Sequence, residues 1–582
     1  MDGLASRLSS LNPFSGSKLE DDEDIGETID SNTLAGGGHA GKETNVTHQL
    51  RVSAALRAFL AEEGILSRQD AGLDDPNQNT DALRALLEKP HATVPPQLTD
   101  RSHPLPDYFI SSSHNTYLLA HQLYGNSSAE AYETALKAGS RCVEIDAWDG
   151  EDKDEPKITH GFTLTSNIPF RMVCETIRDV VDHEATQAID VQGYRAAPIF
   201  ISLENHCSAE GQQRMVDIMH EVFGDRLLNK AIRDKGTEEQ EGVGEHVTLA
   251  ELGSKICVIV EYHFPDETPA DNDMVDRRSR QQRVEDEERK EPPPSAIIIP
   301  ALADLGIYAQ SVKPPNDAWF EKGVLESSPH HPLINVSETG LLAHMPVHSS
   351  KIANHNSNHL MRVYPKGTRI SSANLNPVPF WAVGAQICAL NWQTFGASMQ
   401  LNEALFSGTD GYVLKPASLR HSRKTIYIDK PRQSRKRRLR LYVAGATDVP
   451  VPADRPQDGS DIKPYLTCTL VDPTNPPAKQ KTAPYKQHKV TGLFHQRSNP
   501  PNTEPLWDET LEWEYEDNEN ELVFLRMLIK SDDAFATNLK LAVSAVRMLY
   551  VQMDEWVFIR MLNLKGQETR CSLLVKFEIV DL

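Results

Sequence analysis

The stretch from Pro106 to Cys207 contains four apolar runs, which read PDYFISSSHNTY (106–117), CVEIDAWDG (142–150), KITHGF (157–162) and PIFISLENHC (198–207). Each run ends in ionisable or amide side chains, and helix-length segments separate the runs. Alternation of buried strands and helices predicts parallel β/α units, and a β/α barrel carries its chemistry where its strands end. The stretch therefore predicts half of a β/α barrel whose four consecutive strands deliver polar groups to one face.

Two carboxylates in the second run point to the same side of their strand. Glu144 and Asp146 are two positions apart, so they repel each other unless a cation lies between them. With Asn115 and Glu204 they offer three carboxylates and one amide, the oxygen ligands that Ca²⁺ or Mg²⁺ prefers. The runs predict a divalent-cation site, and the alternative is a structural ion-pair network with arginines such as Arg141.

Two histidines, His114 and His160, end neighbouring predicted strands beside this set. Histidine both takes and gives a proton near neutral pH. Two imidazoles next to a cation suit cleavage of a phosphodiester. One deprotonates the attacking hydroxyl or orients the group that does, and the other protonates the leaving oxygen, while the cation stabilises charge on phosphate. We expect His121, His206 and His263 to be structural.

Composition excludes several classes of protein. The 582 residues predict two to four domains, and the net charge of −23 argues against general nucleic-acid binding. Seven scattered cysteines without a C-x-x-C pair predict free thiols rather than disulfides or zinc. Neither a signal peptide nor an apolar run of about 18 residues is present, so we expect a cytoplasmic protein.

Changes of composition and of secondary-structure pattern along the chain give the predicted domain boundaries. Residues 1–47, rich in serine, glycine and acidic residues, predict a disordered tail. Residues 48–98 carry two amphipathic helix patterns and predict a small region like a calcium-binding EF-hand that lacks the D-x-D-x-D-G ligand spacing. We expect this region to be a helical cap packed on the next domain.

Beyond residue 98, helix-length spacers are present between strand patterns until about residue 420 and absent afterwards. Strands without such spacers predict an all-β sandwich. The predicted order is a first barrel half (104–263), a charged linker (264–295), a second barrel half (296–420), a second linker (421–436) and the sandwich (437–582).

The motifs resemble those of eukaryotic phosphoinositide-specific phospholipase C. The runs that look like its X region are SSSHNTY (111–117), EIDAWDG (144–150), HGFTLTS (160–166) and SLENHC (202–207). The runs that look like its Y region are RVYPKG (362–367), 374–381, 386–394 and GYVLKPA (411–417). The sandwich stands where the family carries a C2 domain. The resemblance covers residues 50–582 and implies a split TIM-type barrel in a delta-like layout without the lipid-binding pleckstrin-homology domain.

The resemblance also implies residue roles. The implied Ca²⁺ ligands are Asn115, Glu144, Asp146 and Glu204, and the implied catalytic residues are His114 and His160. In the implied reaction the inositol 2-hydroxyl attacks the 1-phosphate, diacylglycerol leaves, and water opens the cyclic phosphodiester. Glu144 then serves as ligand and candidate base, His160 as acid towards the leaving group, and His114 as stabiliser of the phosphorane.

Two further sets of residues follow from the resemblance. The implied headgroup contacts are Asn335, Arg362 and Tyr364. The implied apolar ridge that meets the membrane is Leu123, Phe162, Leu164 and Leu342, with Thr368 in place of a tryptophan that the family often adds. Ordinary loop hydrophobics are the alternative interpretation of that ridge. The basic run Arg435 to Arg438 is a further candidate for membrane contact.

The chain departs from the family at two places. The family carries a Lys-x-Lys pair for the 4- and 5-phosphates where this chain has Ile259 and Glu261. Since a carboxylate repels phosphate, we expect phosphatidylinositol or its monophosphate to compete well as substrate. In the sandwich, Lys463 and Lys530 stand near Asp532 and Asp533, where calcium-binding C2 loops carry aspartates. We therefore expect a C2 domain that packs on the barrel and does not need calcium.

The leading prediction is a calcium-dependent phosphodiesterase that acts on a phosphoinositide lipid at the membrane surface, as a monomeric peripheral protein that binds no nucleic acid. One alternative is a glycerophosphodiesterase, against which the split barrel and the trailing sandwich argue. The other is a non-enzymatic scaffold for lipid or protein. Against it stands the retention of all six implied cation ligands and histidines.

Overall fold

Eight parallel strands form a closed barrel, as the sequence predicts. In chain order they are β1 (Tyr108–Ile110), β3 (Cys142–Trp148), β6 (Ile199–His206), β7 (Ile256–Glu261), β8 (Gln310–Val312), β9 (Pro332–Ser337), β10 (Leu360–Tyr364) and β11 (Ile387–Cys388). Each strand pairs in parallel with the next from β3 to β11, and β11 pairs with β1. A parallel bridge between Ser112 and Cys142 completes the ring. Four strands come from each predicted half.

The fold is that of a computed structural model. It describes residues 49–74, 79–118, 128–150, 155–159, 167–187, 196–233, 247–264, 297–314, 316–321, 327–366, 373–421, 435–490, 497–517, 522–532 and 539–582. The tail predicted over 1–47 lies outside these residues, and so do residues 265–295 of the predicted charged linker.

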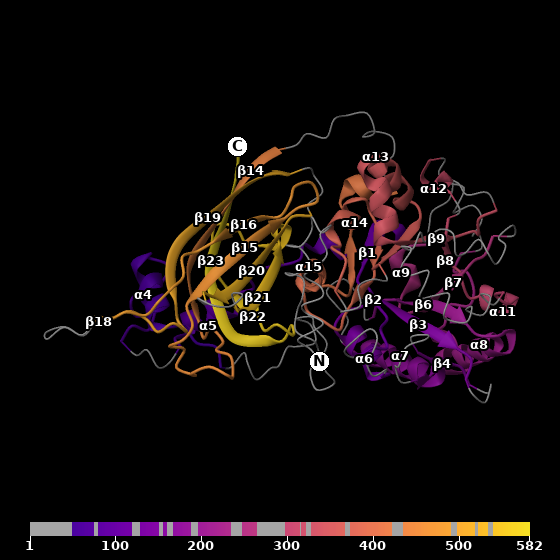
Figure 1. The fold of residues 1–582 in the computed structure, drawn as a ribbon, viewed down its shortest axis with the longest axis horizontal. Coiled ribbons are helices and arrows are strands. Elements are labelled where there is room, and N and C mark those ends of the chain that lie inside the picture. The colour runs from indigo at the N-terminus through magenta and orange to yellow at the C-terminus, as the bar shows by residue number, and fades with distance from the viewer. Residues whose placement is uncertain are drawn as a thin grey trace, which may run out of the picture.

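Helices cover the outside of the barrel (Figure 1). They are α6 (Glu130–Lys137), α7 (Phe170–Ala185), α8 (Ala209–Phe223), α9 (Leu249–Leu252), α11 (Pro300–Ala303), α12 (Ala318–Glu321), α13 (Glu338–Asn356), α14 (Val378–Ala382) and α15 (Ala397–Phe406). Alternation along β7 shows how strands and helices share the core. Val258 packs in a cluster with residues of α7 and α8. Ile259, on the other face of the strand, packs in a second cluster that includes residues of the other barrel strands.

One of the four barrel strands predicted for the first half, the run 157–162, is not a barrel strand. β4 (Lys157–Ile158) pairs antiparallel with β3, and β5 (Ile168–Pro169) pairs antiparallel with β4. The prediction of four consecutive parallel strands is wrong for this third run, because residues 149–156 are fewer than the dozen or so that a parallel crossover needs. β13 (Tyr412–Leu414) likewise lies antiparallel to β1. The strands that complete the two halves are β7 and β9.

A curled antiparallel sheet of eight strands forms the C-terminal body, in the order β16-β15-β20-β21-β22-β23-β14-β19. The strands are β14 (Arg435–Thr447), β15 (Pro464–Val471), β16 (Ala478–Lys481), β19 (Leu506–Asp517), β20 (Phe524–Ser531), β21 (Leu539–Arg547), β22 (Trp556–Leu562) and β23 (Glu568–Asp581). The short β17 (Lys489–Val490) and β18 (Arg497–Ser498) pair separately. This arrangement agrees with the predicted C2-type sandwich. Its first strand already includes Arg435 and Lys436, which the prediction assigned to a linker.

Helix α15 and strand β20 join the sandwich to the barrel. The ring of Phe524 lies 5.9 Å from the ring of Trp381, and the Arg526 side chain donates a hydrogen bond of 2.6 Å to Gln400 on α15. Apolar residues of both bodies belong to one buried cluster. The expectation that the sandwich packs on the barrel is confirmed, and Figure 1 shows α15 between the two bodies.

The N-terminal helices α4 (Ala54–Glu62) and α5 (Asp81–Glu88) cover the far side of the sandwich (Figure 1). Phe59 meets Trp556 edge to face at 5.1 Å, and the Ser53 backbone N–H donates to the Thr447 hydroxyl at 3.1 Å. The expectation that these helices cap the next domain along the chain is therefore wrong. Their apolar faces pack instead on sandwich residues that include Phe558.

Candidate active site

Three carboxylates meet at the carboxyl end of the barrel. Glu144, Asp146 and Glu204 each place an oxygen within 4.8 Å of the others, and the β3–β6 register sets Asp146 beside Glu204. Burial, together with the charges of Glu204 and Glu144, raises the pKa of Asp146 well above its usual range. Burial and the charge of Glu144 also raise the pKa of Glu204. A bound cation would relieve this repulsion.

Asn115, the predicted amide ligand, follows the short strand β2 (Ser113–His114) and joins the cluster. Its backbone N–H donates to Glu144 Oε2 at 2.7 Å, and its φ of 47° is one that residues other than glycine seldom adopt. The buried Tyr117 hydroxyl lies 2.6 Å from Asp146 Oδ2 and 3.1 Å from Asn115 Oδ1. Tyr117 was not predicted as a site residue, although it ends the same motif as Asn115.

A divalent cation fits this cluster. Asp146 Oδ1 is buried and has no hydrogen-bond partner within the part of the chain that the structure describes. The donor set contains only oxygens, which matches the preference of hard cations. Three of the four predicted ligands, Glu144, Asp146 and Glu204, could hold the ion, and the fourth, Asn115, contacts Glu144 through its backbone N–H.

His114 lies beside the cluster, with Nε2 3.9 Å from Glu144 Oε2. Its Nδ1 is 2.8 Å from Oδ1 of Asn391, a residue that the sequence analysis did not assign to the site. Asn391 ends an apolar run, as the other site residues do, and that position was the available signal. Burial and the nearby positive charge of Arg362 lower the pKa of His114 to about 4. His160, its predicted partner, lies outside the described residues.

The predicted headgroup residues come together on β9 and β10, but Arg362 also contacts the cluster. Its guanidinium pairs with Glu144 Oε1 at 2.5 Å and donates to Asn335 Oδ1 at 3.2 Å. Burial opposes its charge, and the carboxylates of Glu144 and Glu204 raise its pKa. The guanidinium lies 5.8 Å from the centre of the Tyr364 ring. Arg362 thus neutralises Glu144, a predicted cation ligand, in a fully buried ion pair.

Glu261 ends β7 on the inward face of the barrel. Ser202 pairs with Ile259, and two residues further along these strands are Glu204 and Glu261. Burial and the charge of Glu204 raise the pKa of Glu261 to about 7, against an opposing effect of Lys313. Ile259 is buried in the barrel core. Neither position supplies a cation at this edge of the mouth.

The structure describes only part of the predicted apolar ridge. Leu342, near the start of α13, is 44% exposed, while Leu123, Phe162 and Leu164 lie outside the described residues together with Thr368. The described helices include none with the length and apolar character needed to span a bilayer.

The basic run in β14 faces acidic strands. Arg438 pairs with Glu514 at 2.5 Å and Arg437 pairs with Asp581 at 3.1 Å. These contacts offset the positive charge of the basic run, which is a candidate for membrane contact. At one end of the sandwich the Asp532 N–H donates to the Lys463 carbonyl at 3.0 Å, and Asp533 lies outside the described residues.

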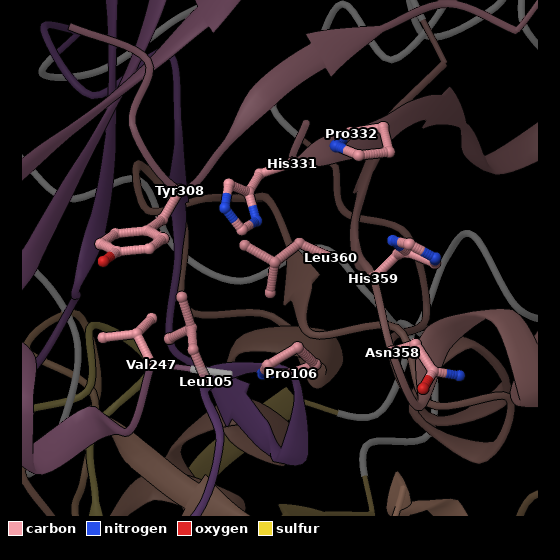
Figure 2. A pocket seen from close by; sticks show the side chains of 9 residues that line it. All are labelled: Leu105, Pro106, Val247, Tyr308, His331, Pro332, Asn358, His359 and Leu360. Carbon is pink, nitrogen blue, oxygen red and sulfur yellow. The ribbon is translucent and has the colours of Figure 1, made fainter. Parts of the chain in front are cut away.

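A separate small pocket lies at the opposite end of the barrel (Figure 2). It is lined by Leu105, Pro106, Val247, Tyr308, His331, Pro332, Asn358, His359 and Leu360. These residues precede or begin β1, β7, β8, β9 and β10, so the pocket is at the amino end of the strands. It is therefore distinct from the carboxylate cluster, which lies where barrel enzymes carry their chemistry.

Comparisons with known proteins match both barrel halves. Residues 101–262 match the X domain of phosphatidylinositol-specific phospholipase C, and residues 302–418 match its Y domain. The chain is 29% identical over 443 residues to human 1-phosphatidylinositol 4,5-bisphosphate phosphodiesterase zeta-1, covering 75% of this chain and 67% of that protein. It is 30% identical over 505 residues to the human delta-1 protein, covering 83% of this chain and 61% of that protein.

A solved structure shares the overall fold. The crystal structure of L. pealei PLC21 superposes with a TM-score of 0.66 at 23% identity and covers 93% of this chain and 69% of that chain. The chain spans about two thirds or less of the length of the curated relatives that it matches. From the paired X and Y matches, the chain belongs to the eukaryotic phosphoinositide-specific phospholipase C family.

Proposed function

We propose that this chain is a calcium-dependent phosphodiesterase that hydrolyses phosphoinositides at a membrane surface to diacylglycerol and an inositol phosphate. The observation that carries the proposal is the cluster of Glu144, Asp146 and Glu204 beside His114, at the carboxyl end of a barrel built from X and Y halves. Relatives named as phosphatidylinositol 4,5-bisphosphate phosphodiesterases support the substrate class.

Calcium suits the cluster better than magnesium. Mg²⁺ usually keeps several waters, whereas Ca²⁺ accepts many protein oxygens in flexible geometry. When bound, the ion supplies Lewis acidity that lowers the pKa of a hydroxyl and stabilises negative charge on phosphate.

The residues around the cluster orient Glu144 and carry out the proton transfers. Arg362 and the Asn115 N–H fix the two oxygens of Glu144, and Oε2 faces His114. The inositol 2-hydroxyl attacks the 1-phosphate, its proton passes to Glu144 or His114, and the bond to the diacylglycerol oxygen breaks. His160 gives that oxygen its proton. Water then opens the cyclic diester, with the same groups exchanging protons in reverse.

The direct test is release of inositol phosphate from phosphatidylinositol vesicles as calcium is titrated. We expect turnover that requires calcium, and a loss of about 10²–10⁴-fold in His114→Ala and in His160→Ala. Vesicle binding without release at saturating calcium would favour the scaffold function. Glycerol phosphate as the product would favour a glycerophosphodiesterase.

We also propose peripheral membrane attachment of a cytoplasmic monomer through the apolar ridge. The 44% exposure of Leu342 at the mouth side of α13 supports this contact. Leu342→Asp should weaken sedimentation with vesicles and slow lipid hydrolysis, and hydrolysis of a soluble substrate analogue should not change. An equal loss on both substrates would argue against a membrane role for Leu342.

For lipid preference, we propose that phosphatidylinositol and its monophosphate compete well with the bisphosphate. The absence of a cation at Ile259 and Glu261 supports this order, because extra ring phosphates would lack partners at β7. Rates on phosphatidylinositol, its 4-phosphate and its 4,5-bisphosphate at fixed calcium measure the order. A rate on the bisphosphate far above the other two would contradict it.

A further inference from the structure

A short strand from the second barrel half contacts a catalytic histidine from the first. β2 pairs in parallel with β12 (Leu390–Asn391), and the register sets Asn391 opposite His114. The Asn391 Oδ1 lies 2.8 Å from His114 Nδ1. We propose that Asn391 is a positioning residue that fixes the tautomer and ring orientation of His114, so that Nε2 is the nitrogen presented to the substrate. This inference rests on the function proposed above.

The orientation of the Asn391 amide follows from its second partner. Its Nδ2 donates to the Ala373 carbonyl at 3.1 Å. A carbonyl oxygen only accepts, so the amide nitrogen must face Ala373 and the amide oxygen must face His114. Since that oxygen also only accepts, His114 Nδ1 must carry the hydrogen.

Asn374 holds Asn391 in place. The Asn391 backbone N–H donates to Asn374 Oδ1 at 2.6 Å, and Asn374 Nδ2 donates to the Asn391 carbonyl at 2.9 Å. The Asn374 side chain thus bonds both backbone groups, as a neighbouring strand would. Asn391 and Asn374 are only 1% and 4% exposed, so breaking this arrangement would leave buried polar groups without partners.

The fixed ring directs the other nitrogen of His114 to the cation cluster. Nε2 lies 3.9 Å from Glu144 Oε2. With Nδ1 engaged, Nε2 is the nitrogen that His114 presents to the bound diester. Outer partners commonly fix the tautomer of functional histidines in this way. Here the histidine comes from the X half and its partner from the Y half, so the first half alone does not complete this group.

Two substitutions separate orientation from packing. Asn391→Leu keeps the branched shape of the side chain and removes the acceptor, whereas Asn391→Asp retains an oxygen for Nδ1–H. We expect Asn391→Leu to lower kcat on phosphatidylinositol vesicles by about 10–100-fold, with KM and the calcium half-saturation within about twofold of the parent. The kcat of Asn391→Asp should be closer to that of the parent than to that of Asn391→Leu.

Asn402→Ala is the matched control. Asn402 is a buried amide of the same half, on α15, whose side chain lies 3.5 Å from the Ser111 hydroxyl. It makes no described contact with His114, and its loss should leave kcat unchanged.

A readout independent of turnover is the nitrogen-15 spectrum of histidine-labelled protein, with the His114 signal assigned by its loss in His114→Ala. The parent should carry hydrogen on Nδ1, and Asn391→Leu should show a mixture of tautomers. The proposal is overturned if Asn391→Leu keeps both kcat and the His114 signal, or if both Asn391 variants lose calcium response and stability alike. If the parent releases no inositol phosphate while its His114 signal responds as expected, the proposed function fails and the orientation role stands.

Discussion

The two ends of the barrel differ in how fully their buried polar groups are hydrogen-bonded. At the carboxyl end, three carboxylates lie within 4.8 Å of one another, and Asp146 Oδ1 has no hydrogen-bond partner among the described residues. At the amino end, the Gln386 side-chain nitrogen lies within hydrogen-bond distance of the carbonyls of Pro106, Asn356 and His359. The Gln386 oxygen accepts from the Met361 N–H at 2.8 Å.

A buried amine at the amino end also has polar partners. Lys415 Nζ donates to the Asn356 carbonyl at 3.0 Å, with Asp107 as an electrostatic partner. Burial alone therefore does not mark a functional site in this barrel. A buried group whose hydrogen bonds are complete stabilises the fold. Like charges that are held together with incomplete hydrogen bonding indicate a ligand site.

The largest expected effect is at the carboxyl end. Asp146→Asn should lower cation affinity by at least about 10–100-fold, since even outer contacts to a metal ligand have effects of that size. Inositol phosphate release at limiting calcium should fall with it. In chelator the same variant should unfold at a higher temperature, because one of three repelling charges is gone. Asp217→Asn, on the exposed face of α8, is the control, and an unchanged calcium titration in Asp146→Asn would argue against ligation.

At the amino end the opposite outcome is expected from Gln386→Leu. It leaves three buried carbonyls without this donor and should lower the free energy of unfolding by about 2–3 kcal/mol. Activity per folded molecule should not change, because the site is at the other end. Urea unfolding and active-site titration measure the two quantities. A variant of normal stability with reduced turnover would reverse the assignment of the two ends.

The buried Lys415 predicts a pH dependence of stability. Burial lowers the pKa of Lys415 from 10.5 to about 7, so between these values the unfolded chain binds more protons than the folded chain. Stability should therefore rise with pH above about 7, with a slope of at most about 1.4 kcal/mol per pH unit from this group. Lys415→Met should flatten that rise in thermal unfolding from pH 7 to pH 9. Parallel curves for parent and variant would mean that Lys415 keeps an ordinary pKa.

The smallest expected effect concerns lipid choice at the mouth. Glu261→Lys should raise the rate on phosphatidylinositol 4,5-bisphosphate relative to phosphatidylinositol by about two- to fivefold, the size of a partly solvated charge pair. Glu261→Gln should move the ratio in the same direction by less. Glu62→Lys, the same charge change on the exposed face of α4, should leave the ratio unchanged. A ratio that is insensitive to Glu261 would place the ring phosphates elsewhere.

Much of the site could be predicted because it depends on local spacing. The two-residue interval between Glu144 and Asp146 sets both on one face of a strand, and Glu204 lies opposite Asp146 on the next barrel strand. The contact of Arg362 with Glu144 joins positions 218 residues apart, and no periodicity in the sequence signals it. Asn391 does end an apolar run, but nothing local in the sequence links it to His114, because the two residues lie in different halves.

The split barrel and the trailing sandwich were predictable, and the membership and direction of individual strands less so. An apolar run such as Lys157–Ile158 has the same pattern in a parallel or an antiparallel pair, and only the length of the connection distinguishes them. The position of α4 and α5 could not be derived from order along the chain, because amphipathic helices pack on whichever apolar surface completes their core.

The attachment of α4 and α5 to the sandwich has a consequence for synthesis. Lys89 contacts Glu555, 466 positions later. At about 5–20 residues per second the ribosome needs roughly 20–90 s to make the intervening chain. Throughout that interval the first helices emerge with exposed apolar faces and nothing to bind. Chaperone occupancy of nascent residues 50–90 should therefore persist until translation reaches the last strands.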